Sequence, residues 1–351
     1  MGLLPFTGIM TRPFNHPSRE HRLLESLGPF LNYAPSQRYP AGIGDDAALR
    51  RCRRGERLVF TADTLVEGVH FSLAYMTLAE VGFKAMVANL SDCAAMGAGP
   101  DGALVQIVFP QKQRARAKRH VKELYSGIRK ACRRWGFPVV GGNISMGPSW
   151  IVDVTLVGRL GAKQRALHRS GARPGDVLWV SGRPGESAAG LAAIRRWGRA
   201  RAPGELQALI RRHVAPSARI RAGNALAADR NVRAVIDVSD GVSKDCLTLS
   251  YENDLTAELL LTEALASSAM RRAAAQLGAD WQDWFLHGGE DYELLFAASP
   301  AFDPGRLRNQ QGVRFRRIGR FTDRGFGAWV KTCDGSRARL SSGGWDHLGK
   351  K

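Results

Sequence analysis

Along this chain, segments whose hydrophobic residues recur at helical spacing alternate with short apolar runs. This pattern predicts helices and strands in succession. Short apolar runs rich in β-branched and aromatic residues predict strands at 57–63, 102–109, 137–142 and 150–160. Thr77 and Glu80 form a T-x-x-E capping box that opens a helix of small residues running through Ala95. Ser18 can cap an earlier helix that ends at Gly28.

The segment 112–136 is dense in basic residues, and its apolar side chains recur at helical spacing. The lysines and arginines fall off that apolar stripe, and Gly136 stands where a C-terminal cap belongs. We therefore expect an amphipathic helix with a solvated basic face. With its neighbouring strands it completes a β/α/β/β unit.

A polar stretch at 161–176 predicts the connection to a second domain. Beyond it come strands at 177–182, 233–241 and 292–299, a helix from Glu186 and another after 241. This layout predicts an α+β protein with an N-terminal α/β domain over residues 1–160 and a C-terminal α/β domain over 161–351.

Composition agrees with a globular protein, because 44% of the 351 residues are hydrophobic and 24% are charged. No apolar run approaches the ~18 residues of a membrane span, and the first residues lack the pattern of a signal peptide. We expect a cytoplasmic protein without a membrane partner. The five cysteines are scattered without a C-x-x-C pair, which predicts reduced thiols and no zinc site.

The net charge of +19 suggests an anionic partner or a phosphorylated substrate. Nucleic-acid binding is one interpretation, but no zinc finger, RNP motif or helix-turn-helix pattern supports it. Steep weakening of binding with rising salt would identify it. We regard it as the weaker alternative, because it leaves the acidic residues of this basic chain unexplained.

The acidic residues gather in short glycine-, serine- and alanine-rich segments at the ends of predicted elements. These segments are GIGDDAAL (42–49), FTADTLVEGVHF (60–71), NLSDCAAMGA (89–98), DVSDGVSKD (237–245) and GGEDYELLF (288–296). Carboxylates brought together repel one another, and magnesium that carries substrate phosphates relieves this repulsion. A single member, such as Asp46 or Asp240, is also explained as an ordinary Asx turn.

In this order and spacing, together with GGNIS, LHRSGARPGD and the final GGWDH, these segments resemble those of thiamine-monophosphate kinases. That family shares its fold with aminoimidazole ribonucleotide synthetase. The resemblance spans residues 42–347. It implies ATP-dependent phosphorylation of thiamine monophosphate to thiamine diphosphate, the last step of thiamine diphosphate biosynthesis. It also implies a two-domain fold and a homodimer in which the N-terminal domains pair their sheets.

The resemblance also implies roles for individual residues. Magnesium ions would be held by Asp46, Thr61, Asp63, Asp92, Asn143 and Asp237, with Asp240 on a further ion. ATP would be bound by Gly142, Asn143, Arg169 and Ser239. The thiamine moiety would be surrounded by His70, Glu290 and Trp345. Without the resemblance, His70 is explained as a core histidine, Trp345 as a C-terminal anchor and Arg169 as a surface arginine.

Asn143 departs from the family pattern, which commonly has Asp after the glycine pair. Its amide oxygen is a neutral magnesium ligand, or Asn143 is an αL turn residue.

The expected reaction needs no side-chain base, because the acceptor phosphate is already anionic. Two relatives with the same fold are alternatives, a selenophosphate synthetase and a hydrogenase-maturation dehydratase. The first relies on a reactive Cys or selenocysteine in its N-terminal segment and the second on a C-terminal cysteine. No Cys precedes Gly42 here and the last residue is Lys, so we disfavour both.

Overall fold

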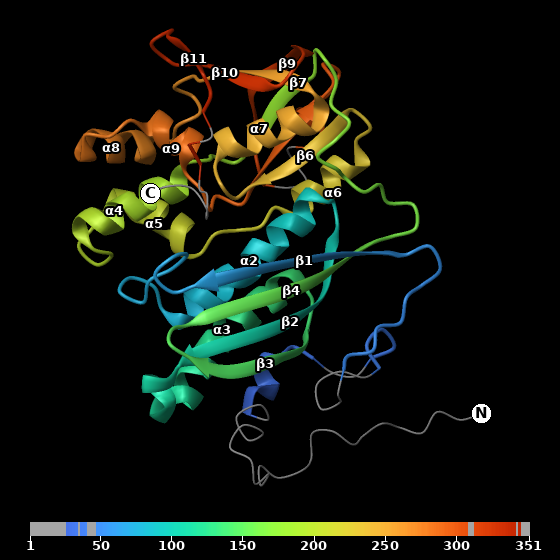
Figure 1. Ribbon diagram of the computed structural model, residues 1–351, viewed down its shortest axis with the longest axis vertical. Helices are drawn as coiled ribbons and strands as arrows, with labels where there is room; N and C mark the ends of the chain where they lie inside the picture. Colours follow the sequence, from blue (N-terminus) through green and yellow to red (C-terminus); the bar gives the residue numbers. More distant parts are fainter. Residues whose placement is uncertain (1–25, 34–35, 41–46, 308–311, 342, 345–351) are drawn as a thin grey trace.

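The structure is a computed structural model that describes residues 26–33, 36–40, 47–307, 312–341 and 343–344. Its chain forms two layered units, one above the other in Figure 1. The lower unit holds the predicted β/α/β/β segment, and the upper unit holds the sequence beyond the polar stretch at 161–176. That stretch contains no helix or strand, as expected of a connection. The division into two domains near residue 161 stays a prediction.

The N-terminal unit is a four-stranded sheet covered on one face by two helices (Figure 1). Its strand order is β1-β4-β2-β3, in which β2 and β3 are parallel and β4 runs antiparallel to both of its neighbours. Its elements are η1 (Gly28–Phe30), β1 (Arg57–Val66), α2 (Leu78–Ala95), β2 (Gly99–Pro110), η2 (Gln111–Arg116), α3 (Ala117–Trp135), β3 (Val139–Gly147) and β4 (Ile151–Leu160).

The predicted starts of the two N-terminal helices fare differently. The capping box is confirmed, since Thr77 accepts a bond from the Glu80 N–H and Glu80 bonds back to the Thr77 N–H. The basic helix was expected from residue 112, but residues 111–116 form a 3-10 turn and α3 begins at Ala117. The side chain of the N-cap residue Arg116 makes no capping hydrogen bond, unlike that of Thr77 at the start of α2. Gly136 ends α3 in the αL conformation with φ 75°, as predicted.

The C-terminal unit contains a seven-stranded mixed sheet in the order β11-β10-β7-β9-β5-β8-β6. Its strands are β5 (Val177–Ser181), β6 (Val232–Val238), β7 (Leu255–Leu260), β8 (Glu293–Ala298), β9 (Phe315–Arg324), β10 (Gly327–Lys331) and β11 (Arg337–Arg339). Its helices are α4 (Glu186–Trp197), η3 (Gly204–Leu206), α5 (Gln207–Val214), α6 (Ile220–Ala228), α7 (Val242–Asn253), α8 (Ser268–Leu277) and α9 (Trp281–His287).

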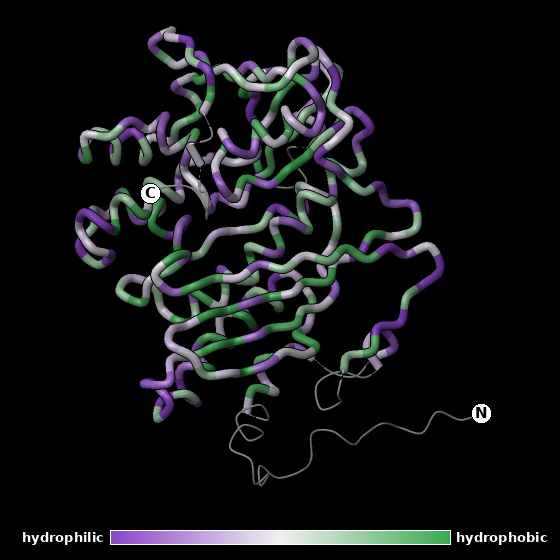
Figure 2. The backbone as a smooth tube through the Cα atoms, in the orientation of Figure 1, coloured by the Kyte–Doolittle hydropathy of each residue, from purple (hydrophilic) through white to green (hydrophobic). Residues whose placement is uncertain are grey.

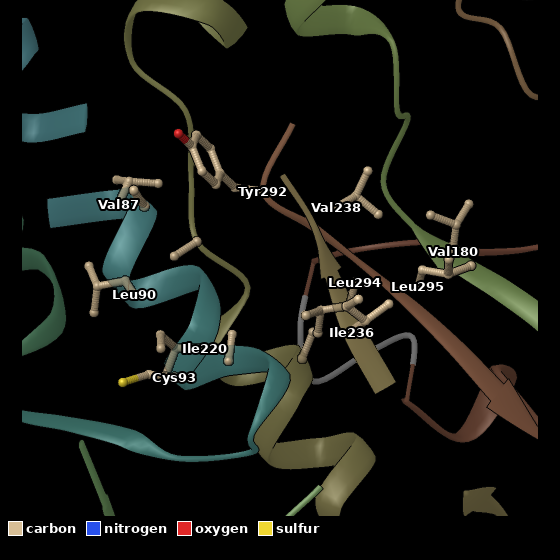
Figure 3. Close-up of a cluster of buried hydrophobic side chains, with 14 of the residues drawn as sticks. Val87, Leu90, Cys93, Val180, Ile220, Ile236, Val238, Tyr292, Leu294 and Leu295 are labelled. Atoms are coloured by element: carbon tan, nitrogen blue, oxygen red, sulfur yellow. The ribbon is translucent and has the colours of Figure 1, made fainter. Parts of the chain in front are cut away.

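Helix α2 joins the two units, because it packs on the four-stranded sheet and also against α6 and β6. Figure 3 draws Val87, Leu90 and Cys93 of α2 in one cluster of buried side chains with Ile220, Ile236 and Tyr292 of the C-terminal unit. The buried side chains of both units form one continuous core. Apolar positions follow the strands of both sheets, whereas hydrophilic positions gather in connecting segments (Figure 2). Buried contacts therefore fix the position of one unit relative to the other.

The surface matches two further expectations. Lys118, Lys130 and Arg133 of α3 are exposed, so the basic stripe is a solvated face. The five cysteines are free thiols, as predicted. Among the described helices, none is both long and apolar enough to cross a bilayer.

Candidate active site

Carboxylates from β1 and α2 meet where the two units join. Thr61 and Asp63 lie two residues apart on β1, so their side chains share the sheet face that α2 covers. Asp92 lies in the last turn of α2 and accepts a hydrogen bond from the Thr61 hydroxyl. The structure thus brings three of the predicted metal ligands together.

Asp237 adds a carboxylate from the C-terminal unit. It lies near the end of β6 and is 4% exposed. The Ser91 hydroxyl on α2 donates to its Oδ2 over 2.8 Å. Ser91 precedes Asp92, so α2 presents adjacent residues to carboxylates of both units. Asp63, Asp92 and Asp237 consequently form one cluster, which we call the acid cluster.

The acid cluster is short of positive charge. Burial and repulsion from Asp92 raise the pKa of Asp63 to about 7, and the same causes raise the pKa of Asp237 to about 7. Burial also raises the pKa of Asp92, although the Thr61 hydrogen bond and the charge of Arg169 oppose the increase. Arg169 was expected at the site, and its charge indeed acts on both Asp92 and Asp237. Carboxylates in this state favour an added cation.

Asp240 and Asp245 extend the acidic region into the start of α7. Asp240 pairs with Lys244 one turn later, with Nζ 2.7 Å from Oδ2. An ion at Asp240 therefore competes with this lysine. Asp245 was missed from the sequence. It is 4% exposed, and its Oδ2 has no hydrogen-bond partner among the described residues. Burial and the charges of Asp237 and Asp240 raise its pKa well above the usual range.

The acidic residues do not form a complete metal cage. In the described part of the chain, no group of three or more His, Cys, Asp or Glu side chains is placed to hold a metal ion unaided. Magnesium characteristically takes one or two carboxylates and completes its shell with phosphate oxygens and water. The donor set therefore fits a magnesium ion that arrives with a phosphorylated ligand better than a resident structural metal.

Gly142 and Asn143 lie within β3, beside Val105 and Gln106 of β2. Gly142 approaches β2 so closely that a Cβ would lie 1.9 Å from the Val105 carbonyl oxygen. The Asn143 Oδ1 accepts a bond of 2.9 Å from the Ile144 N–H. Asn143 is in extended backbone, so the αL turn interpretation is wrong.

The sheet register separates Asn143 from the acid cluster. Thr64, Asp153, Gln106 and Asn143 are aligned across β1, β4, β2 and β3 on the face away from α2. Asp63 lies in the adjacent row, on the face toward α2. Within one chain, Asn143 and Asp63 therefore point to opposite sides of the sheet. The role of Asn143 as a metal ligand stays a prediction.

Glu290 lies beside a buried lysine that was missed from the sequence. Lys84 Nζ is 2.7 Å from Glu290 Oε1, and His213 Nδ1 is 3.6 Å from Oε2. Burial alone would raise the pKa of Glu290, but the charge of Lys84 lowers it overall. Burial and the same lysine lower the pKa of His213 to about 3. The available signal was a lysine between Phe83 and Ala85, which are both apolar.

Two more predicted residues border this pair. His70 is half-buried, and its Nδ1 accepts a bond of 3.0 Å from the Val66 N–H, so it is not a deep core histidine. Its main-chain oxygen accepts a bond of 3.2 Å from Lys84 Nζ. The Ser239 carbonyl oxygen accepts a bond of 2.7 Å from the Glu290 N–H. Ser239 and Glu290 are thus linked through the backbone.

Asp46 and Trp345 lie outside the described residues, so their predicted roles stay predictions. Gly344 is described, and a Cβ there would lie 2.4 Å from the Asp240 carbonyl oxygen. The residue before Trp345 therefore packs against the acidic region.

Comparisons with known proteins find similar sequences and similar folds. The family model for "AIR synthase related protein, N-terminal domain" matches residues 44–160. The thiamine-monophosphate kinase of Escherichia coli (strain K12) is 35% identical over 312 residues, 88% of this chain and 91% of that protein. The same enzyme of Bacillus subtilis (strain 168) is 32% identical over 282 residues, 80% and 83% of the two chains.

Solved structures extend the similarity to three dimensions. Thiamine-monophosphate kinase from Stenotrophomonas maltophilia K279a has a TM-score of 0.75 at 33% identity, covering 86% of this chain and 93% of that one. "AaThiL complexed with AMPPCP and TMP" has a TM-score of 0.73 at 31% identity, covering 94% and 97%. Hydrogenase maturation protein HypE in complex with ATP has a TM-score of 0.72 at 17% identity, covering 93% and 95%, which shows a shared fold alone.

Proposed function

Because the chain belongs to the thiamine-monophosphate kinase family, we propose that it transfers the terminal phosphoryl group of ATP to thiamine monophosphate. One observation carries the proposal. Asp92 of the acid cluster, whose carboxylates are only partly offset by the charge of Arg169, lies on the same helix as Lys84 of the Lys84–Glu290 pair. A phosphate-and-metal site thus adjoins a site that presents a carboxylate to an organic cation. The products are thiamine diphosphate and ADP.

The acceptor explains the residues that the site provides. A phosphate oxygen of thiamine monophosphate is anionic at neutral pH, so it attacks without a side-chain base. The protein must instead align two polyanions and offset their repulsion. Arg169 supplies positive charge beside Asp92 and Asp237 and is well placed for ATP phosphates. Gly142, Asn143 and Ser239 complete the proposed nucleotide contacts.

Magnesium is the metal that fits this donor set. We assign Thr61, Asp63, Asp92 and Asp237 to it, with Asp46 from the neighbouring motif and Asp240 on a further ion. When bound, magnesium neutralises phosphate charge in the transferring group. The raised pKa values of Asp63 and Asp237 are the local observation that supports the fit, since a nearby divalent cation favours the ionised form.

The thiamine end of the substrate is assigned to His70, Glu290 and Trp345. The ionised Glu290 carboxylate offers charge to the thiazolium ring or a hydrogen-bond acceptor to the pyrimidine. An aromatic face such as that of Trp345 suits a cationic ring.

A homodimer is the proposed assembly, formed by the face of the four-stranded sheet that no helix covers. Phe60 on β1 is 68% exposed there. A large apolar side chain exposed on an open sheet face is typical of an interaction surface. Sedimentation of the purified protein should give twice the 38.3 kDa chain mass. A chain that stays monomeric at all concentrations would contradict this assembly.

The reaction is tested by incubating the protein with ATP, magnesium and thiamine monophosphate and separating the products by chromatography. We expect thiamine diphosphate and ADP in equal amounts. Free thiamine is the matched acceptor control. It should react poorly, because its hydroxyl requires a base. No thiamine diphosphate across a range of salt and pH would reject the proposed function, and faster phosphorylation of thiamine would reject the acceptor.

A further inference from the structure

Lys84 is the least expected side chain in α2. It lies in the middle of the helix, is 0% exposed and is flanked by buried apolar residues. Burying an ammonium group is costly, and replacing a buried ion pair by apolar residues is often neutral or stabilising. Core stability alone therefore does not explain a lysine here. A positional role is suggested by what its ammonium contacts.

The Lys84 ammonium joins two segments of the chain that both belong to the proposed substrate site. It bonds Glu290 Oε1 over 2.7 Å and the His70 main-chain oxygen over 3.2 Å. His70 follows β1 in the N-terminal unit, and Glu290 precedes β8 in the C-terminal unit. One buried cation thus fixes the distance between residues on the two sides of the site.

Glu290 needs contacts that hold it in place, because its backbone adopts an unfavourable conformation. Its φ is 63°, a left-handed conformation that non-glycine residues seldom adopt. The Glu290 N–H is held by the Ser239 carbonyl at 2.7 Å, and the carboxylate is held by Lys84 and His213. The side chain nevertheless remains 26% exposed. It is therefore oriented without being covered.

We propose that Lys84 is a positioning residue for thiamine monophosphate, which sets the Glu290 carboxylate and the His70 main chain in the arrangement that receives the thiamine moiety. The inference rests on the proposed function. Lys84 itself need not touch the substrate, because it is fully enclosed by protein. Its loss should affect binding of thiamine monophosphate and leave the ATP side of the site intact.

The test is Lys84→Met, which keeps an unbranched side chain of similar length and removes the charge. We expect the Kd for thiamine monophosphate, measured by calorimetry, to rise roughly tenfold or more, as for a lost charge-assisted hydrogen bond. The KM for ATP should stay within about twofold, since no ATP contact is removed. An unchanged Kd, or equal losses for both ligands, would overturn the proposal.

Arg219→Met is the matched control for a purely structural defect. Arg219 forms another buried pair, with Glu293, and its Nε lies 2.6 Å from Glu293 Oε2. Its loss also strands a buried carboxylate, but that carboxylate is not assigned to substrate. The control should lose stability and keep its Kd for thiamine monophosphate. The same tenfold rise in both variants would mean that Lys84 acts only through stability.

A double-mutant cycle shows whether Lys84 acts through Glu290. Glu290→Gln should raise the Kd, and adding Lys84→Met should raise it further by clearly less than tenfold, because only the bond to the His70 main chain is then lost. A second full tenfold rise would overturn the proposal. This comparison stands even where Lys84→Met alone fails to fold, because the double variant leaves no unpaired buried charge.

Failure of the inference is distinguishable from failure of the proposed function. A wild-type protein that makes thiamine diphosphate while Lys84→Met binds thiamine monophosphate normally would reject only the role of Lys84. A wild-type protein that neither binds nor phosphorylates thiamine monophosphate would reject both.

Discussion

Asp101 and the acid cluster are buried carboxylate sites with opposite surroundings. The Asp101 side chain is 0% exposed and is surrounded by donors. Its oxygens lie 2.9 Å from Arg38, 2.6 Å from Arg50, 3.2 Å from Arg159 and 3.0 Å from the Tyr39 hydroxyl. The charges that act on Asp63, in the same unit, are those of the carboxylates of Asp92, Asp153 and Asp240. One site is saturated with cations and the other has a deficit.

The difference separates structural from functional acids. With 51 Lys and Arg against 32 Asp and Glu, the chain does not lack partners for its carboxylates. Asp101 ties the segment before β1 to the start of β2, and its pairing is complete within the protein. The carboxylates of the acid cluster repel one another, and their negative charge is not fully balanced by the protein. A site that the fold leaves unbalanced is the one where an external cation and phosphates are expected.

The largest expected effect comes from Asp63→Asn, which removes charge from the acid cluster without changing its shape. We expect kcat to fall at least about a thousandfold, on the order of 4 kcal/mol, because a metal ligand is lost. The free energy of unfolding of the metal-free protein should hold or rise, since repulsion with Asp92 is relieved. Steady-state kinetics and urea denaturation measure the two. Near-normal turnover at limiting magnesium would contradict the metal assignment.

Asp101→Asn should show the reverse behaviour. It leaves three arginines without their shared carboxylate, so the free energy of unfolding should fall by about 3 kcal/mol in urea denaturation. Turnover per folded molecule should stay within about twofold, because no proposed substrate contact is removed. Arg38→Met is the control. Its side chain is 39% exposed, and its loss should cost under about 1 kcal/mol. Loss of turnover without loss of stability would break the comparison.

The free energy of unfolding of the metal-free protein should depend on pH because of the acid cluster. The pKa of Asp63 is about 7 when folded and near 3.8 when unfolded, so the folded state binds the proton more tightly. The contribution of Asp63 to the free energy of unfolding is therefore lost as pH rises from about 4 to about 7, by at most roughly 1.4 kcal/mol per pH unit. Asp63→Asn should flatten this slope in urea denaturation.

Magnesium should oppose that loss at and above neutral pH. A cation that binds the ionised cluster stabilises the folded state in proportion to its occupancy. We expect the wild-type protein to gain thermal stability on magnesium addition, and Asp63→Asn to gain less. Equal gains in both proteins would place the stabilising ion elsewhere.

The sequence was most informative where local signals and burial agree. Strand β1 was predicted from an apolar run rich in β-branched and aromatic residues, and helix α2 from a capping box followed by small residues. Strands β7, β9, β10 and β11 were missed, and the arginine-rich sequences of β9 and β11 do not show a clear apolar alternation. The strand order of the seven-stranded sheet could not be predicted from the sequence, because most of its neighbouring strands are distant along the chain.

The site residues likewise divide into those that were predicted from the sequence and those that were missed. Acids in glycine-rich segments were identified from composition, and the resemblance supplied their roles. Lys84 and Asp245 were missed because their importance depends on what packs around them. A lysine next to Phe83 in a helix reads as a surface residue until the C-terminal unit covers it. Contacts between distant segments have no local signature in one sequence.

The smallest expected effect belongs to Asn143→Asp, which tests how far the acid cluster extends. Asn143 is exposed and lies on the sheet face opposite Asp63. The sheet separates an added carboxylate there from the acid cluster of the same chain. Half-saturation by magnesium, titrated at saturating ATP, should therefore fall by no more than about twofold. Ser145→Asp, two residues along the same strand, is the control for added surface charge and should behave alike. A fall of tenfold or more for Asn143→Asp alone would show that this side chain ligates the metal, and that the cluster is completed from the open face of the sheet.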